Sequence, residues 1–303
     1  MAQLKNKIID LIGYPMNLGA NRYGAELGPA ALRIAGIKNC LEQCGYKVID
    51  KGDITVHGKI EDENTNPKLK NYQNIVLSST NLAEWVENSL RESRFPLVLG
   101  GDHSMALGTI AGVSSFCKKN KKRLGVIWID AHADMNTDET SPWGNIHGMP
   151  LAASLGYGNN ILTGIYGFSN KIKPENCGLI GIRDVDDGEQ ALINKLNFPA
   201  YTMEQVRKKG IAEVTKEMLN RLIKNVDFIH VSFDIDSIDP ELAPGVGTTV
   251  PNGFNEDETN ILMKMIAETG LVNSLEITEV NPILDIKNIS SEFAVKAVSF
   301  LMR

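Results

Sequence analysis

Runs of apolar residues alternate with stretches of helical spacing along this 303-residue chain. Several runs are apolar at nearly every position, which is typical of strands buried on both faces of a parallel sheet. The predicted strands lie at residues 7–14, 95–99, 124–129, 178–182, 228–233 and 275–280. The predicted helices lie between them, at residues 29–44, 82–92, 189–196, 211–224 and 256–269.

This regular alternation favours an α/β fold, in which a mostly parallel sheet is covered by helices on both faces. Gly270 follows the last predicted helix and is a plausible helix end. The polar stretch 59–74 predicts a surface loop or an irregular lead-in to a helix. Because no repeat, low-complexity segment or Pro/Ser-rich linker divides the chain, we expect residues 1–303 to form one domain.

Composition narrows the class of protein. The chain has 37 acidic and 31 basic side chains and a formal net charge of -6, which argues against a nucleic-acid partner. The densest basic run, at residues 118–123, is best interpreted as a solvated connecting turn. No apolar run reaches the roughly 18 residues that a membrane span needs. Four scattered cysteines do not form a disulfide pattern and fit a reducing, cytoplasmic setting.

Polar side chains follow three of the predicted strands. Asp102 and His103 follow the strand at 95–99, the sequence DAHAD follows the strand at 124–129, and Asp234 and Asp236 follow the strand at 228–233. Ligands of open parallel sheets bind beyond the carboxyl ends of the strands. Each segment alone is also typical of a turn or a helix cap, but three such segments at three strand ends predict one shared site.

The spacing of these residues indicates a metal centre. On extended backbone, residues two apart point the same way, so Asp130, His132 and Asp134 can face one point. Asp234, Asp236 and His103 complete a set of four carboxylates and two imidazoles. Four adjacent aspartates would repel one another strongly, and two divalent cations would balance their charge. Such mixed ligands suit Mn²⁺, Fe²⁺ or Co²⁺, and a two-metal site can generate hydroxide from a bridging water.

These segments resemble the three metal-binding signatures of the ureohydrolases, the family of arginases and agmatinases. The segments are GGDHS (100–104), DAHAD (130–134) and SFDIDSIDP (232–240). The resemblance runs from residue 22 to the last helix, and the sequence is similar to bacterial arginases of the Bacillus type. It includes GNIHGMPLAASLG (144–156), GIRDVDDGE (181–189), APGVGT (243–248) and EVNPILD (279–285).

The resemblance implies a three-layer α/β/α fold with two Mn²⁺ ions per subunit. One ion would be held by His103, Asp130, Asp134 and Asp234, and the other by His132, Asp130, Asp234 and Asp236. A hydroxide bridging the ions would attack the guanidinium carbon, and Asp134 would orient it. The resemblance also implies a homo-oligomer, either a trimer or a hexamer.

Three further residues match catalytic or guanidinium-binding positions of the family. His147 matches a proton shuttle for the departing amine, a role that suits an imidazole. Glu279 matches the carboxylate that pairs with the substrate guanidinium, whose forked donors a carboxylate accepts well. Thr248 matches a hydroxyl in the same pocket. The alternatives are a loop histidine bonded to backbone for His147 and an ordinary turn residue for Thr248.

The substrate-binding loop contains one departure from the family. Asn136 and Ser141 match contacts to the α-carboxylate of arginine, and Asp186 matches the carboxylate that binds the α-amino group. Trp143 stands where arginases usually have serine. An inward indole would remove a carboxylate contact and narrow the pocket, whereas an outward one would be a surface or subunit-contact aromatic.

The sequence therefore predicts manganese-dependent hydrolysis of L-arginine to L-ornithine and urea. The first alternative is the same chemistry on agmatine or another guanidino compound, which Trp143 favours and Asn136 and Asp186 oppose. The second is a non-catalytic metal-binding scaffold. The intact ligand set, His147 and Glu279 count against that alternative.

Overall fold

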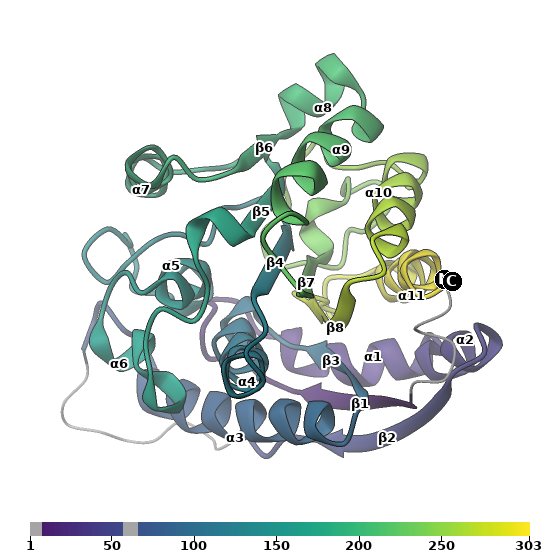
Figure 1. Ribbon diagram of the computed structural model, residues 1–303, viewed down its shortest axis with the longest axis horizontal. Helices are drawn as coiled ribbons and strands as arrows, with labels where there is room; N and C mark the ends of the chain where they lie inside the picture. Colours follow the sequence, from purple (N-terminus) through teal and green to yellow (C-terminus); the bar gives the residue numbers. More distant parts are fainter. Residues whose placement is uncertain (1–7, 57–65) are drawn as a thin grey trace.

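The computed structural model describes residues 8–56 and 66–303, and its framework is an eight-stranded sheet (Figure 1). The strand order is β2-β1-β3-β8-β7-β4-β5-β6, and every paired strand within the described residues is parallel. The strands are β1 (Ile8–Tyr14), β2 (Lys47–Asp53), β3 (Phe95–Gly100), β4 (Leu124–Ile129), β5 (Cys177–Ile182), β6 (Ala200–Thr202), β7 (Phe228–Asp234) and β8 (Val272–Thr278).

Helices cover both faces of this sheet, so the fold has the three α/β/α layers that were predicted (Figure 1). One layer consists of α1 (Gly28–Ile34), α2 (Ile37–Gln43), α8 (Met203–Lys209), α9 (Ile211–Leu222), α10 (Glu256–Glu268) and α11 (Ile289–Leu301). The other consists of α3 (Tyr72–Arg91), α4 (Ala106–Lys119), α5 (Pro150–Leu155), α6 (Asn160–Thr163) and α7 (Asp187–Leu196).

Two apolar cores explain why the strands read as continuous hydrophobic runs. Alternate side chains of a strand point to opposite faces. On β3, Leu97 and Leu99 join the core under α1, α10 and α11, whereas Val98 joins the core under α3 and α4. Every residue of β3 is buried, so the strand has no solvent-facing position at which a polar residue would interrupt the apolar run.

Two strands at the edges of the sheet were missed. β2 and β6 are the outermost strands, and each pairs on one side only. Most of β2 is exposed and Val48 is its one buried residue, so it shows no apolar run. The predicted strand at 275–280 is displaced, because β8 spans Val272–Thr278. Lys7, at the start of the first predicted strand, lies outside the described residues.

Two predicted helices were wrong in extent. The helix predicted at 29–44 is broken into α1 and α2 by Gly36, which has a left-handed φ of 86°. The helix predicted at 82–92 is the second half of α3, which begins at Tyr72. The polar stretch 59–74 therefore ends inside α3, and its residues 59–65 lie outside the described part of the chain. Gly270 follows α10 with a left-handed φ of 67°, as predicted.

Other sequence expectations can be placed on the fold. The basic run 118–123 covers the last residues of α4 and the turn into β4, which confirms the predicted connection. The four cysteines are free thiols. Among the described helices, none combines the length and the apolar character needed to cross a membrane.

The four central strands bring the predicted site together. β3, β8, β7 and β4 are neighbours, and their carboxyl ends carry His103, Glu279, Asp234 and Asp130 respectively. The turn after β3 needs glycine because it packs directly on backbone. A Cβ on Gly101 would lie 2.0 Å from the carbonyl oxygen of Met16, and the next amide, Asp102, donates to that same oxygen at 2.8 Å.

Candidate metal centre and active site

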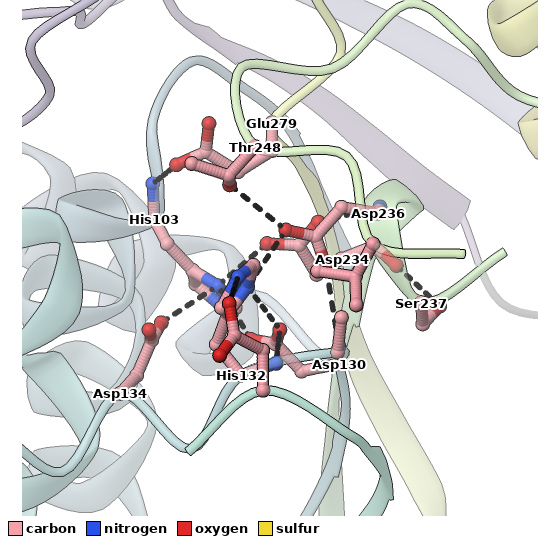
Figure 2. Close-up of polar contacts among 12 residues, drawn as sticks. His103, Asp130, His132, Asp134, Asp234, Asp236, Ser237, Thr248 and Glu279 are labelled. Atoms are coloured by element: carbon pink, nitrogen blue, oxygen red, sulfur yellow. Dashed lines mark hydrogen bonds and ion pairs between the residues drawn. The ribbon is translucent and has the colours of Figure 1, made fainter. Parts of the chain in front are cut away.

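The six predicted ligands lie around one point at the carboxyl edge of the sheet (Figure 2). The Nδ1 atom of His103 lies 2.9 Å from Asp234 Oδ2, 3.0 Å from Asp134 Oδ2 and 3.1 Å from Asp130 Oδ2. The Nδ1 atom of His132 lies 3.0 Å from Asp236 Oδ2 and 3.5 Å from Asp130 Oδ1. Among the described residues, His103–Asp130–Asp134 and Asp130–His132–Asp236 could each hold a metal ion.

This donor geometry fits divalent cations. Ligand atoms about 2.1 Å from an ion and at right angles to each other are about 3.0 Å apart, the spacing seen around His103. His103 Nδ1 and Asp134 Oδ2 are buried and make no well-formed hydrogen bond, although they lie close together. A buried polar atom without a hydrogen bond is unfavourable unless something else satisfies it. The residues therefore fit a bound metal better than a self-contained hydrogen-bond network.

The electrostatics of the ligand cluster point the same way. Burial, together with the charge of Asp236, raises the pKa of Asp234 well above its usual value. Burial and the charge of Asp130 raise the pKa of Asp134 to about 6. Burial also opposes ionisation of Asp130, but the adjacent imidazoles of His103 and His132 outweigh it and lower the pKa of that carboxyl. Crowded carboxylates of this kind are stabilised by cations.

Asp130 connects the two ligand groups. Its Oδ2 accepts a hydrogen bond from the Trp128 indole at 2.8 Å, and its Oδ1 accepts one from the His132 amide at 2.7 Å. The carboxylate is fully buried beneath the cavity and is held in one orientation. One oxygen faces His103 and the other faces His132, which is the arrangement that a ligand shared by two ions requires.

Two predicted residues have backbone conformations that are rare for side chains larger than glycine. Asp134 has a φ of 51° and Glu279 a φ of 63°. Such left-handed residues are uncommon outside glycine, asparagine and aspartate, and they cluster at functional sites. In Figure 2 the Asp134 carboxylate points to the ring of His103 and the Glu279 carboxylate points to the backbone amide of His103, so the unusual backbone serves to aim them.

Glu279 lies between the ligand cluster and His147. Its Oε1 accepts hydrogen bonds from the His103 amide at 2.8 Å and from His147 Nδ1 at 3.1 Å. Burial disfavours a charged imidazole, but the hydrogen bond and charge of Glu279 outweigh this and raise the pKa of His147 to about 9. His147 also donates its backbone N–H to the Gly19 carbonyl, so it makes a backbone contact without losing its place in the site.

The predicted substrate loop forms one wall of the cavity. Asn136 donates through Nδ2 to Asp186 Oδ2 at 2.8 Å, and its Oδ1 accepts from the Thr140 hydroxyl. Asp186 caps α7 by accepting from the amide of Glu189. Glu189 in turn accepts from the amides of Met135 and Asp186, and burial and Asp134 raise its pKa to about 8. These bonds join the loop at 134–140 to the start of α7.

The remaining three predicted residues, Ser141, Thr248 and Trp143, differ in how far they are exposed to solvent. Ser141 is buried, and its hydroxyl accepts from the Gly144 amide, which shapes the loop. Thr248 donates its hydroxyl to Asp236 Oδ2 at 3.3 Å. Trp143 borders the cavity, but 69% of the residue is exposed. Its indole therefore stands at the mouth, largely in solvent, and a narrowed pocket stays a prediction.

A cavity of about 450 Å³ gathers these groups. This volume is in the usual range for a small-molecule site. It is lined by every predicted site residue except Asp130, namely His103, His132, Asp134, Asn136, Ser141, Trp143, His147, Asp186, Asp234, Asp236, Thr248 and Glu279.

Sequence reasoning missed several residues that support the site. Trp128 and Ser232 each lie two positions before a predicted ligand, Asp130 and Asp234 respectively, so the period of two could have identified them. Glu189 stands three residues after Asp186, which is the spacing of a capping box. Arg183 gave no comparable signal. Its guanidinium donates to the carbonyls of Asp236 and Val250, which ties two loops of the site together.

Comparison with known proteins places the chain in a family. The model of the Arginase family matches residues 7–302. An arginase of Brevibacillus brevis is 47% identical over 97% of this chain and 97% of its own length. The crystal structure of an arginase from Bacillus cereus is 44% identical, covers 98% of both chains and has a TM-score of 0.91. The native structure of Bacillus caldovelox arginase is 45% identical over the same shares, with a TM-score of 0.93. The chain therefore belongs to the arginase family and is a ureohydrolase enzyme.

Proposed function

We propose that this enzyme hydrolyses the guanidinium group of L-arginine to give L-ornithine and urea, and that it uses two Mn²⁺ ions. The bacterial relatives that are 43–47% identical to it are named arginases. The observation that carries the proposal is the pairing of two features in one cavity. The His and Asp cluster lies at the base, and the linked Asn136 and Asp186 lie on the wall.

The two ions would be held by the overlapping ligand groups. His103 and Asp134 would serve one ion, His132 and Asp236 the other, and Asp130 and Asp234 both. When bound, such a pair supplies an activated water as the nucleophile at neutral pH. We propose manganese because imidazole and carboxylate ligands suit it and because the family resemblance points to it.

Glu279 and His147 would act on the substrate. Glu279 Oε1 is engaged by His103 and His147, which leaves Oε2 to accept a guanidinium N–H. A carboxylate held in this way orients the planar cation above the ligand cluster. His147 holds a proton at the pH of the cell, since its pKa is raised to about 9. It would pass that proton to the departing amine.

The cavity wall would distinguish arginine from related compounds. Asp186 would accept from the α-amino group, and Asn136 and Ser141 would contact the α-carboxylate. Agmatine lacks that carboxylate, so it would leave the Asn136 side of the wall without a partner. A buried polar group left without its partner weakens the binding of the wrong substrate.

The test is urea release by purified, manganese-loaded protein supplied separately with arginine, agmatine or guanidinobutyrate. We expect urea from arginine and at most slow release from the other two. Urea from agmatine but not from arginine would overturn the choice of substrate. No urea from any of them, with two metals bound, would favour a non-catalytic role. The variant Asp186→Asn provides a matched comparison, because it should raise KM for arginine and agmatine, which carry the amino group, more than for guanidinobutyrate, which lacks it.

The setting of the enzyme is also proposed. One sheet runs from β2 to β6 with a core on each face, which supports a single catalytic domain over residues 1–303. We propose a cytoplasmic homo-oligomer, a trimer or a hexamer, acting on a small guanidino substrate without nucleic-acid or membrane partners. Light scattering on the purified protein tests the oligomeric state.

A further inference from the structure

A second cavity lies at the amino ends of the central strands, on the opposite edge of the sheet from the ligand cluster. Its volume is about 480 Å³. Its lining includes Leu124, which begins β4, Asn176, which precedes β5, and Asn225, which lies three residues before β7. Since β4 and β7 carry predicted metal ligands at their other ends, this cavity is separate from the active site, and the two share no lining residue.

This second cavity is strongly basic, although the whole chain has a net charge of -6. Glu175 is the one carboxylate among its lining residues. Arg123 is paired with Asp227 at 2.8 Å, so its charge is balanced. Within residues 8–56 and 66–303, the four lysines of the lining have no carboxylate at ion-pair distance. We call this site the basic cavity and define it by those lysines, Lys118, Lys122, Lys171 and Lys173.

Lys171 is a buried cation without a counter-ion. The residue is 5% exposed, and its ammonium group donates to the carbonyls of Thr163 at 2.7 Å and Phe168 at 2.9 Å. Burial lowers the pKa of Lys171 to about 8, and no neighbouring carboxylate opposes that effect. At neutral pH the group is still mainly charged, and two carbonyl dipoles balance only part of that charge. An anion in the basic cavity would supply the missing counter-ion.

Aromatic rings hold the lysine side chains beside the cavity. The ammonium groups of Lys118 and Lys171 each lie 5.2 Å from the centre of the Phe168 ring. The ammonium group of Lys122 lies 5.8 Å from the centre of the Phe116 ring. Contacts of this kind attract a cation without neutralising its charge. They therefore place positive charges from two separate segments around one space and leave them free to bind an anion.

Asn176 adds a neutral donor to the basic cavity. The residue is 7% exposed, and its backbone N–H donates to the Lys173 carbonyl at 2.9 Å. Its side-chain amide makes no hydrogen bond with another described residue. Ser114, which also lines the cavity, is satisfied by donating its hydroxyl to the Lys171 carbonyl at 2.7 Å. A nearly buried amide without a partner is unfavourable, so Asn176 offers a donor that a bound ligand would satisfy.

We propose that the basic cavity binds a small phosphate-bearing anion. Several cations without carboxylate partners call for a ligand with two or more negative charges, and ammonium and amide N–H donors call for acceptor oxygens. The cavity has the size of a small-molecule site, and the Phe168 ring borders it, so it has room for an organic group beside the phosphate. The basic run at 118–123 thus supplies Lys118 and Lys122 to a binding site, beyond the solvated turn predicted for it. The inference is independent of the proposed substrate.

Calorimetric titration of the manganese-loaded enzyme tests this proposal. After excess Mn²⁺ is removed, the protein would be titrated at low ionic strength with inorganic phosphate, AMP and adenosine. We expect phosphate to bind with a dissociation constant of about 1 mM or lower, AMP to bind at least as tightly, and adenosine not to bind. Tighter binding of AMP would identify an organic phosphate as the ligand, and equal binding would identify the inorganic ion. If neither phosphate nor AMP binds, the proposal is overturned.

Two neighbouring lysines provide matched variants for the same titration. Lys122→Gln removes a charge from the basic cavity, whereas Lys121→Gln removes one from an exposed neighbour that does not line it. We expect Lys122→Gln to weaken phosphate binding by about three- to tenfold and Lys121→Gln by less than about twofold. Both variants should release urea from arginine as wild type does, because both residues lie far from the active-site cavity.

A third variant tests the buried donor. Asn176→Asp keeps the shape of the side chain but places a negative charge beside the anion, so phosphate binding should weaken by more than about tenfold. Equal weakening by the two lysine variants would mean that phosphate responds only to overall surface charge, which would refute the proposal. Wild-type binding by Lys122→Gln and Asn176→Asp would place the phosphate elsewhere, such as at the metal ions, and would also refute it.

Discussion

The two histidine ligands of the candidate metal centre have opposite surroundings. The side chain of His103 is 1% exposed, stacks on Trp128 and is backed by Ser232. The side chain of His132 is 22% exposed, and its outer nitrogen lies 3.8 Å from Asp184, a residue on the surface. We call the side of the centre around His103 the closed half and the side around His132 the open half, with the carboxylate of Asp130 between them.

The contrast teaches what each half depends on. The closed half is an extension of the core, so its ligand geometry is set by packing and by buried hydrogen bonds. The open half borders the cavity through which substrate must enter, and its histidine is fixed mainly by the carboxylates in front of it. Substitutions in the closed half should therefore change stability and metal affinity together, whereas those in the open half should act on metal and substrate alone.

The largest effect is expected where the halves meet. Asp130→Asn keeps the shape of the side chain but removes the charge shared by both ligand groups. Changing a residue that merely supports a ligand already costs 10- to 100-fold, so urea release should fall by at least about 100-fold. Steady-state kinetics and the number of Mn²⁺ ions bound per chain measure this. If two ions still bind as in wild type, the shared ligand has been wrongly assigned.

Alanine at the two histidines should separate the halves by stability. In metal-free protein, His103→Ala removes a ring packed on Trp128 and should cost about 3 kcal/mol of the free energy of unfolding. His132→Ala removes a partly exposed ring and should cost less than about 1 kcal/mol. Urea unfolding in the presence of a chelator compares them. Equal losses would show that the ring of His103 contributes no more to the core than the ring of His132 does.

Glu279 links the closed half to the cavity, and its charge should be visible in the titration of His147. Replacing it by glutamine removes the charge that stabilises the imidazolium, so the pKa of His147 should fall from about 9 toward its ordinary value near 6.5. A raised pKa adds stability that is present below pH 6.5 and lost as pH rises through 9. Relative to Glu279→Gln, the wild type should therefore lose stability across that range. NMR titration of metal-free protein measures the pKa, and an unchanged value would separate His147 from Glu279.

The smallest effect is expected at the mouth of the open half. Since most of Trp143 is in solvent, Trp143→Ser should change KM for arginine by no more than about threefold. Trp143→Phe, which keeps an aromatic ring, is the control. A clear improvement in KM with serine alone would mean that the indole turns inward and obstructs the substrate.

The difference between the halves also explains which parts of the molecule the sequence could predict. Buried central strands appear in the sequence as apolar runs. Strand geometry then predicts that residues two apart just beyond them, such as Asp130 and His132, point the same way. The edge strand β2 has no such signal because solvent, not core, surrounds most of its side chains. The break at Gly36 was also hidden, since glycine is compatible with both a helix interior and a left-handed turn.

The supporting residues of the closed half were hidden for a different reason. Ser232 lies 2.8 Å from the ring of His103 only because β3 and β7 both flank β8 in the sheet, although 129 positions separate the two residues in the chain. Strand order is a property of the whole sheet, and no local pattern reports it. For Trp143 the sequence identified the residue but not the direction of its side chain. That direction depends on where the loop meets solvent.

Removal and stepwise return of metal tests the central claim most directly. Protein stripped with a chelator would be supplied with arginine and with increasing Mn²⁺, and urea release would be followed against the number of ions bound. We predict no urea from the metal-free enzyme and full recovery only when both the closed and the open half are filled, at two ions per chain. Full activity without metal, or complete recovery at a single ion, would contradict the account.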